Sequence, residues 1–146
     1  MSDKSELERR TKAFALRVIR FVASLPKTKV AEVLGFQLLK SGTSIGANYR
    51  EANRAESRSD FIHKIGVTEK EAAETQYWLE IFEELGIGQP ENRCWLLHES
   101  GELVTIFTSI GRTSKSRNLK TRSSNSQFAI RKFEIELNQT TRGGIR

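Results

Sequence analysis

The sequence contains few cysteines and histidines, which supply many catalytic and metal sites. Its 146 residues include one cysteine, Cys94, and two histidines, His63 and His98. A single cysteine excludes an internal disulfide and any cysteine-based zinc site within one chain. We therefore expect Cys94, beside Trp95, to be a small core residue. No serine or cysteine has the histidine and the strained turn that activate a nucleophile, so we expect no catalytic triad and no enzyme.

Prolines and long apolar runs are also scarce. The chain has two prolines and 37% hydrophobic residues, and no eighteen-residue stretch of apolar residues without charge. Such a stretch would be needed to span a membrane, and a basic start followed by an apolar run would mark a secretory signal. We therefore expect a cytoplasmic protein. The length fits one domain plus a tail.

Apolar residues recur at steps of three and four along four segments, which predicts four amphipathic helices. Their expected bounds are Asp3 to Leu25, Thr28 to about Arg58, Ser59 to Gly86, and Glu91 to Gly111, with Thr28 and Ser59 as N-caps and Gly86 as a C-cap. The connections are short, and no segment before residue 114 alternates like a strand. The sequence thus predicts an all-α, antiparallel up-down-up-down four-helix bundle over residues 1–113.

Charge is distributed unevenly along the chain. Residues 1–64 carry 13 basic and 7 acidic side chains, residues 65–111 carry 2 and 9, and residues 112–146 carry 9 and 2. Residues 114–146 begin with a polar, serine-rich and basic stretch, so we expect a disordered basic C-terminal tail. Within it, "FAIRKFEIEL" (Phe128 to Leu137) alternates and could form a short strand, although an isolated strand is unstable in water. A basic tail favours an acidic partner such as nucleic acid, or it serves only for solubility.

The stretch "SGTSIGANYREA" (Ser41 to Ala52) could be a phosphate-binding loop or a helix-packing face. A Walker A loop needs a glycine directly before its lysine and a strand upstream, whereas Leu39 precedes Lys40 within a helical pattern. Gly42 and Gly46 lie one helical turn apart, so they give a helix face almost without side chains, against which a second helix can pack closely. The predicted helix-packing motif comprises Gly42, Ser44, Gly46, Asn48 and Glu51.

Three carboxylates could meet inside the bundle: Glu51, Glu71 and Glu74. Di-metal bundles use inward-facing glutamates, but they also require Glu-x-x-His pairs, and neither histidine follows a glutamate at that spacing. We therefore expect no metal and no cofactor. The alternative is that these carboxylates pair with arginines such as Arg17 or Arg54.

Arginines occur in two groups on the predicted bundle. Arg50, Arg54 and Arg58 follow one another at steps of four, where like charges repel, so we expect neutralisation by Glu69, Glu80, Glu83 and Glu84 within the bundle or between copies. The first helix and the tail have fewer acidic neighbours. The candidate nucleic-acid-binding residues are therefore Arg9, Arg10, Arg17, Arg20, Lys115, Arg117, Lys120 and Arg122.

Two motifs, "SIGANYREA" (Ser44 to Ala52) and "KEAAETQYWLE" (Lys70 to Glu80), resemble a family of bacterial four-helix bundle proteins. This family includes proteins encoded in intervening sequences of 23S ribosomal RNA genes, and the resemblance covers roughly Arg10 to Thr113. It implies a small up-and-down bundle that associates as a pentameric ring. The family is similar to the accessory protein of diversity-generating retroelements, which works with a reverse transcriptase and binds nucleic acid through a basic surface.

Two functions are consistent with these observations. The first is a non-catalytic homo-oligomer that binds RNA or DNA through salt-sensitive phosphate contacts. The second is a protein-interaction scaffold that binds a partner polypeptide, such as a reverse transcriptase, without touching nucleic acid.

Overall fold

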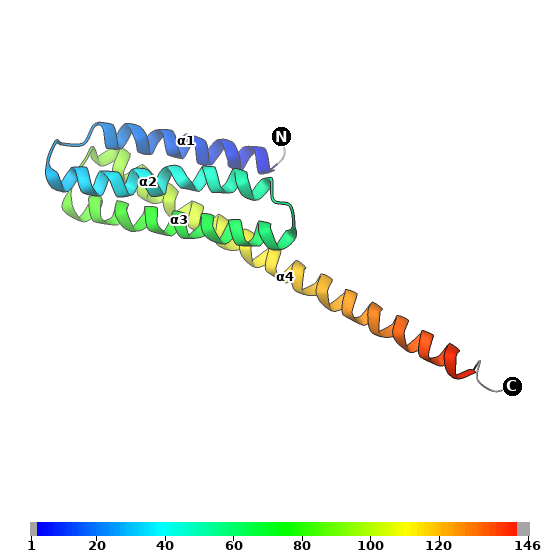
Figure 1. The fold of residues 1–146 in the computed structure, drawn as a ribbon. Coiled ribbons are helices and arrows are strands. Elements are labelled where there is room, and N and C mark those ends of the chain that lie inside the picture. Colours follow the sequence, from blue (N-terminus) through cyan, green and yellow to red (C-terminus); the bar gives the residue numbers. More distant parts are fainter. Residues whose placement is uncertain (1–2, 143–146) are drawn as a thin grey trace. The chain divides into compact units, whose positions relative to one another are not determined.

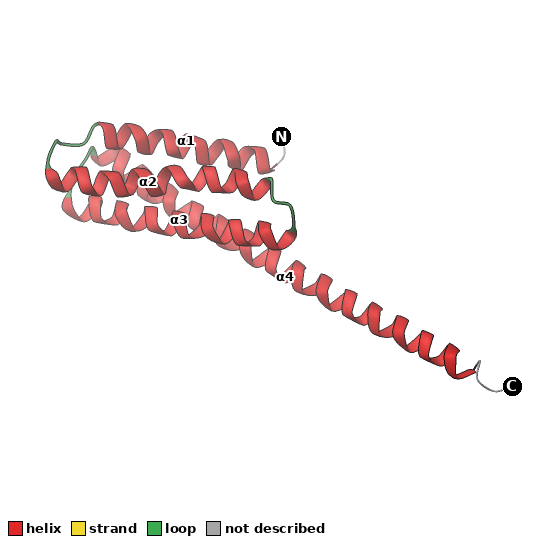
Figure 2. Ribbon diagram, viewed as in Figure 1, coloured by secondary structure: helices red, strands yellow, loops and turns green. Residues whose placement is uncertain are grey.

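The computed structural model describes residues 3–142, and their secondary structure consists of four α-helices with no strand (Figure 1, Figure 2). The helices are α1 (Asp3–Ala23), α2 (Lys29–Asn53), α3 (Arg58–Leu85) and α4 (Pro90–Arg142). The predicted all-α class is confirmed. The chain divides into two units between Arg112 and Thr113, and each is described by itself.

Local capping sets most helix ends in the first unit. The Thr28 side chain accepts a hydrogen bond at the start of α2, and Gly86 ends α3 in the left-handed conformation, with φ of 64°. Both caps agree with the sequence prediction. The start of α3 differs, because Ser57 rather than Ser59 accepts the hydrogen bond from the Asp60 backbone N–H. Pro90 opens α4, a position where its missing N–H costs nothing.

One apolar core is shared by α1, α2, α3 and the first-unit part of α4. Phe14, Ile45, Leu79 and Phe107 come from the four helices in turn, and each is fully buried. Each such side chain stabilises the fold by about 1.5–3 kcal/mol relative to an exposed one. The first unit is therefore a helical bundle whose stability comes from this common core.

Polar contacts show the direction in which neighbouring helices run. Two pairs join α1 to α4 and two join α3 to α4: Arg10–Glu99, Arg17–Asn92, Thr108–Glu69 and Arg93–Glu83. In each set, residues later in one helix meet residues earlier in the other, so α4 is antiparallel to both α1 and α3. The same order relates α1 to α2, since Gly46 lies against Thr11 and Gly42 against Val18.

The second unit differs from the prediction. The sequence pattern predicts a helix end near Gly111, a disordered tail after residue 113, and a possible strand at residues 128–137. The structure instead places residues 113–142 in α4, as helix. Neither glycine nor proline occurs from residue 112 to 142, so nothing in the backbone chemistry stops the helix. Serine, threonine and asparagine lower helix propensity only by roughly 0.5 kcal/mol each.

Candidate nucleic-acid interface

The glycine face of α2 lies against α1. A Cβ atom added at Gly42 would lie 3.0 Å from Val18 Cγ2, and one added at Gly46 would lie 3.2 Å from Thr11 Oγ1. Both glycines are buried within a continuous helix. This face therefore serves helix packing, and its backbone N–H groups are not arranged as a phosphate loop.

The polar members of the same motif bond locally or face outward. The Ser44 hydroxyl donates to the backbone oxygen of Lys40 at 2.6 Å, and Asn48 Nδ2 donates to the backbone oxygen of Ser44 at 2.9 Å. Glu51 is exposed. These side chains thus satisfy their own helix and do not converge on a ligand position.

The three candidate carboxylates do not form a metal centre. No group of three or more metal-ligating side chains occurs in the part of the chain that the structure describes. Burial raises the pKa of Glu71, the neighbouring Glu74 adds to the increase, and Lys40 opposes it. Glu74 instead accepts a hydrogen bond from Trp78 Nε1 at 3.3 Å. The expected pairing of these carboxylates with Arg17 or Arg54 is not found among the described residues.

Two of the four arginines predicted on α1 are paired with carboxylates. Arg9 Nε donates to Glu6 at 3.2 Å, and this hydrogen bond lowers the pKa of Glu6. Arg10 Nε donates to Glu99 Oε2 at 3.1 Å, which raises the pKa of Arg10. Their charge is thus partly compensated before any ligand binds.

The other two α1 arginines differ from each other. Arg17 donates to Asn92 Oδ1 at 3.0 Å and lies 4.0 Å above the ring of Trp95, a cation–π arrangement. Arg20 is exposed and makes no ion pair within residues 3–139. Of the predicted α1 residues, Arg20 therefore has the charge that is most available to a phosphate.

A buried arginine on α4 was missed by sequence reasoning. Arg93 is only 8% exposed, and its guanidinium donates to Glu83 at 2.6 Å and to the backbone oxygens of Ile87 and Gly88. It thereby ties the α3–α4 turn to both helices. Cys94, one position later and about 100° around the helix, is exposed. The prediction of Cys94 as a core residue is wrong, because Arg93 takes the inward position.

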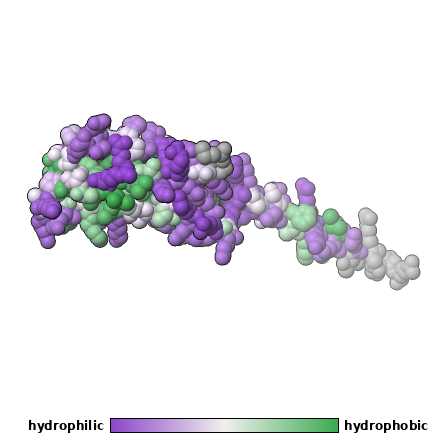
Figure 3. All heavy atoms as spheres, turned by 90° about the horizontal axis from the view of Figure 1, so that it is seen from above, coloured by the Kyte–Doolittle hydropathy of each residue, from purple (hydrophilic) through white to green (hydrophobic). Residues whose placement is uncertain are grey.

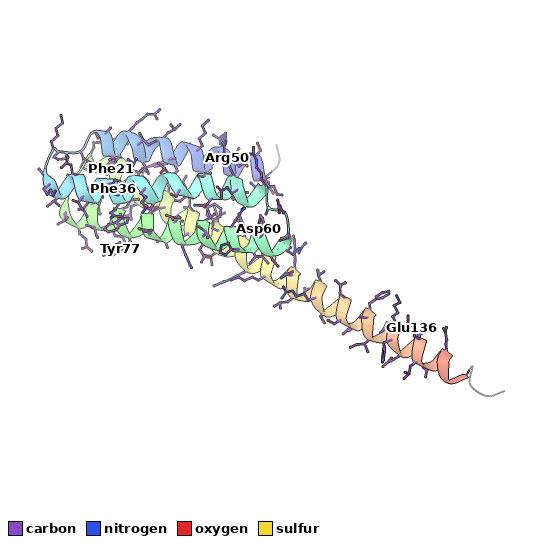
Figure 4. The ribbon with its side chains drawn as sticks, viewed as in Figure 1. Phe21, Phe36, Arg50, Asp60, Tyr77 and Glu136 are labelled. Atoms are coloured by element: carbon purple, nitrogen blue, oxygen red, sulfur yellow. The ribbon has the colours of Figure 1, made fainter. Side chains whose placement is uncertain are left out.

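The arginines at the end of α2 and the start of α3 are not neutralised by other residues that the structure describes. Arg50, labelled in Figure 4, Arg54 and Arg58 are exposed, and none makes an ion pair with a described residue. On α3, Glu83 pairs with Arg93, while Glu80 and Glu84 are exposed without a described ion pair. The neutralisation expected inside the bundle is therefore absent among these residues.

The second unit, together with Arg112 directly before it, presents the most uniform positive surface. Seven basic residues and no acidic one occur from residue 112 to 132: Arg112, Lys115, Arg117, Lys120, Arg122, Arg131 and Lys132. All are exposed, and none forms an ion pair with a described residue. The four predicted residues fall on two sides of the helix, with Lys115 and Arg122 seven positions apart and Arg117 and Lys120 three apart. A polyanion could therefore approach this helix from either side.

These features define the class of protein: a small helical bundle with a basic C-terminal helical unit. The chain belongs to the 23S rRNA-intervening sequence protein family, whose model matches residues 3–109. The expected family relationship is confirmed. The matched range ends before the basic stretch that begins at Arg112.

A solved structure supports the same assignment. It is a protein of unknown function of the S23 ribosomal protein family from Bacteroides thetaiotaomicron, 38% identical, with a TM-score of 0.66. The match covers 71% of this chain and 96% of that one. No curated protein matches the sequence. Within residues 3–142, no helix has the length and apolar character that a membrane crossing requires.

Proposed function

We propose that this protein is a non-catalytic, homo-oligomeric four-helix bundle with up-down-up-down connectivity that binds RNA or DNA through its basic residues. The observation that carries the proposal is the run from Arg112 to Lys132, in which seven exposed cations occur without a carboxylate. Unpaired cations on a helix repel one another, so neutralisation by a polyanion is favourable.

The expected recognition is of the phosphate backbone. Lys115, Arg117, Lys120 and Arg122 supply point charges and bidentate groups, whereas the first aromatic side chain of this unit is Phe128. Base stacking needs aromatic residues among the cations. Binding is therefore expected to depend strongly on salt and weakly on sequence.

Two features of the first unit support association of copies. The outward side of α2 exposes Val30, Val33 and Phe36 by 55%, 51% and 62%, and Figure 3 shows apolar surface at the end of this unit that holds the α1–α2 connection. In addition, the exposed arginines near the α2–α3 connection and the exposed glutamates of α3 could neutralise each other between copies. The family resemblance suggests five copies.

A salt titration of binding tests the proposal. In filter binding with a single-stranded RNA and a DNA duplex, the logarithm of affinity should fall linearly with the logarithm of salt concentration. The quadruple variant K115Q/R117Q/K120Q/R122Q should bind more weakly and lose about 3 units of that slope, at about 0.7–0.9 per lost phosphate contact.

The matched control removes four exposed cations from the first unit, as K4Q/K12Q/K27Q/K29Q. The control keeps the same net charge as the test variant, so it should keep most of the affinity and slope if the basic helix makes the contacts. If full-length protein retains neither RNA nor DNA at low salt, the nucleic-acid function is rejected and binding of a partner polypeptide becomes the leading hypothesis. Light scattering of the purified protein gives the copy number, and a monomer would reject the homo-oligomer.

A further inference from the structure

The helix of the second unit carries two apolar faces. Phe128, Ile130, Phe133 and Ile135 are exposed by 71%, 58%, 65% and 57%. At about 100° per residue, Phe128 and Ile135 share one side of the helix, and Ile130 and Phe133 share a roughly opposite side. Figure 4 labels Glu136 on the same stretch of α4. Large apolar side chains on both sides of one helix need a covering partner on each side.

Charged residues flank the two faces with opposite signs. Arg131 and Lys132 lie on either side of the Phe128/Ile135 face, which we call the basic-edged face. Glu134 and Glu136 lie on either side of the Ile130/Phe133 face, which we call the acidic-edged face. The assignment follows from the sequence positions and the helical period. Neither Arg131 nor Glu134 forms an ion pair with another described residue.

We infer that this helix binds a second copy of itself, in parallel, with the acidic-edged face of one copy against the basic-edged face of the next. In that arrangement the two apolar faces cover each other, and Glu134 of one copy lies on the same side of the contact as Arg131 of the next. The two positions differ by three residues, or about 4.5 Å along the axis. Long side chains span that offset, so the charges complement each other.

A contact between two different faces is heterologous, and each copy keeps one face open for a further copy. If two acidic-edged faces paired in a two-fold parallel dimer, Glu134 of each copy would lie on the same edge of the contact as Glu136 of the other. These like charges would repel each other. This contact rests on the proposed homo-oligomer and specifies one interface within it. That interface lies outside residues 3–109, which the family model matches.

Engineered disulfides test which faces meet. In a Cys94→Ala background, Phe133→Cys and Ile135→Cys are made separately in the full-length chain. A disulfide needs Cβ atoms about 4 Å apart, whereas equivalent atoms of adjacent parallel helices are separated by roughly the 9 Å between their axes. Under mild oxidation, neither variant alone should cross-link, and an equimolar mixture should give a covalent dimer.

Cross-linking of Phe133→Cys with itself would overturn the inference in favour of like-face pairing. Absence of a dimer in the mixture, with helicity by circular dichroism unchanged, would also overturn it.

A charge exchange provides a second test with less risk to packing. Glu134→Arg and Arg131→Glu should each lose tail association when alone, and an equimolar mixture should restore it, because each altered charge then meets its opposite. The control Arg122→Glu changes a residue that lies outside both edges, so mixing it with Glu134→Arg should not restore association. If either single variant associates as well as the unmodified chain, the inference fails.

A chain truncated after Arg112 separates this contact from the proposed function. If light scattering shows that the truncated bundle still forms the oligomer, failure of the disulfide and charge tests rejects only the tail contact. If both the truncated and the full chains are monomers, the homo-oligomer itself is rejected.

Discussion

The close contact between α1 and α2 makes a sharp prediction for alanine at Gly42. The added Cβ would lie 3.0 Å and 3.1 Å from the two γ-carbons of Val18, closer than the about 3.5–4.0 Å of a normal carbon contact. At Gly66, within α3, an added Cβ meets nothing within 4 Å. The two substitutions are thus chemically identical but differ in the space available.

Alanine improves helix propensity by about 1 kcal/mol at either position. At residue 42, overpacking costs about 1–3 kcal/mol and outweighs that gain. Gly66→Ala should therefore raise the free energy of unfolding by about 1 kcal/mol and Gly42→Ala should lower it by about 1 kcal/mol, a difference of about 2 kcal/mol. Gly42→Leu should destabilise further, because the longer side chain cannot fit beside Val18.

Urea denaturation followed by circular dichroism measures these changes. All variants must be compared at one protein concentration, because association of copies changes apparent stability. If Gly42→Ala stabilises the protein as much as Gly66→Ala does, the two helices do not touch at this face, and the packing role of the glycines is refuted.

Three further predictions concern the core, a partly buried ion pair and the effect of pH. Phe107→Ala removes a fully buried ring whose centroid lies 5.3 Å from that of the Tyr49 ring. Urea denaturation should show a decrease of about 3–5 kcal/mol in the free energy of unfolding. Glu99→Ala leaves Arg10, whose side chain is 35% exposed, without its carboxylate and should lower the free energy of unfolding by about 0.5–1.5 kcal/mol, whereas the exposed control Glu80→Ala should change it little. Burial raises the pKa of Glu71 above 4.5, so the folded state favours the protonated carboxyl group. The protonated group stabilises the fold fully below pH 4.5, and this stabilisation is lost as pH rises through the folded-state pKa. Glu71→Gln should therefore raise Tm at pH 7 and lose that advantage near pH 4, and an equal advantage at both pH values would contradict this.

The sequence predicted the all-α fold and several helix ends because these depend on local chemistry. Thr28 and Gly86 cap helices through contacts within one turn, so their residue types suffice. The predicted N-cap of α3 lies two residues too late, at Ser59 instead of Ser57, because the two serines are equivalent as residue types. Only the position of the Asp60 N–H selects between them.

Tertiary contacts explain where prediction failed. Residue type places Cys94 inside and Arg93 outside, whereas hydrogen bonds from the Arg93 guanidinium reverse that order. Similarly, Arg10 and Arg17 were candidate phosphate ligands, and only the packing of α4 against α1 shows their partners Glu99 and Asn92. The serine-rich composition of residues 114–146 also favoured a disordered tail. That prediction did not take into account that residues 112–142 contain no glycine or proline to end the helix.

Under the proposed function, the helical form of the basic segment determines how much nucleic acid one copy can cover. Arg122 lies seven positions after Lys115, or about 10.5 Å along the axis at about 1.5 Å per residue. That length corresponds to about three phosphates of one duplex strand, which are about 3.4 Å apart. With so short a footprint, each copy would hold a polyanion weakly, and tight retention would require several copies to engage the same strand at once.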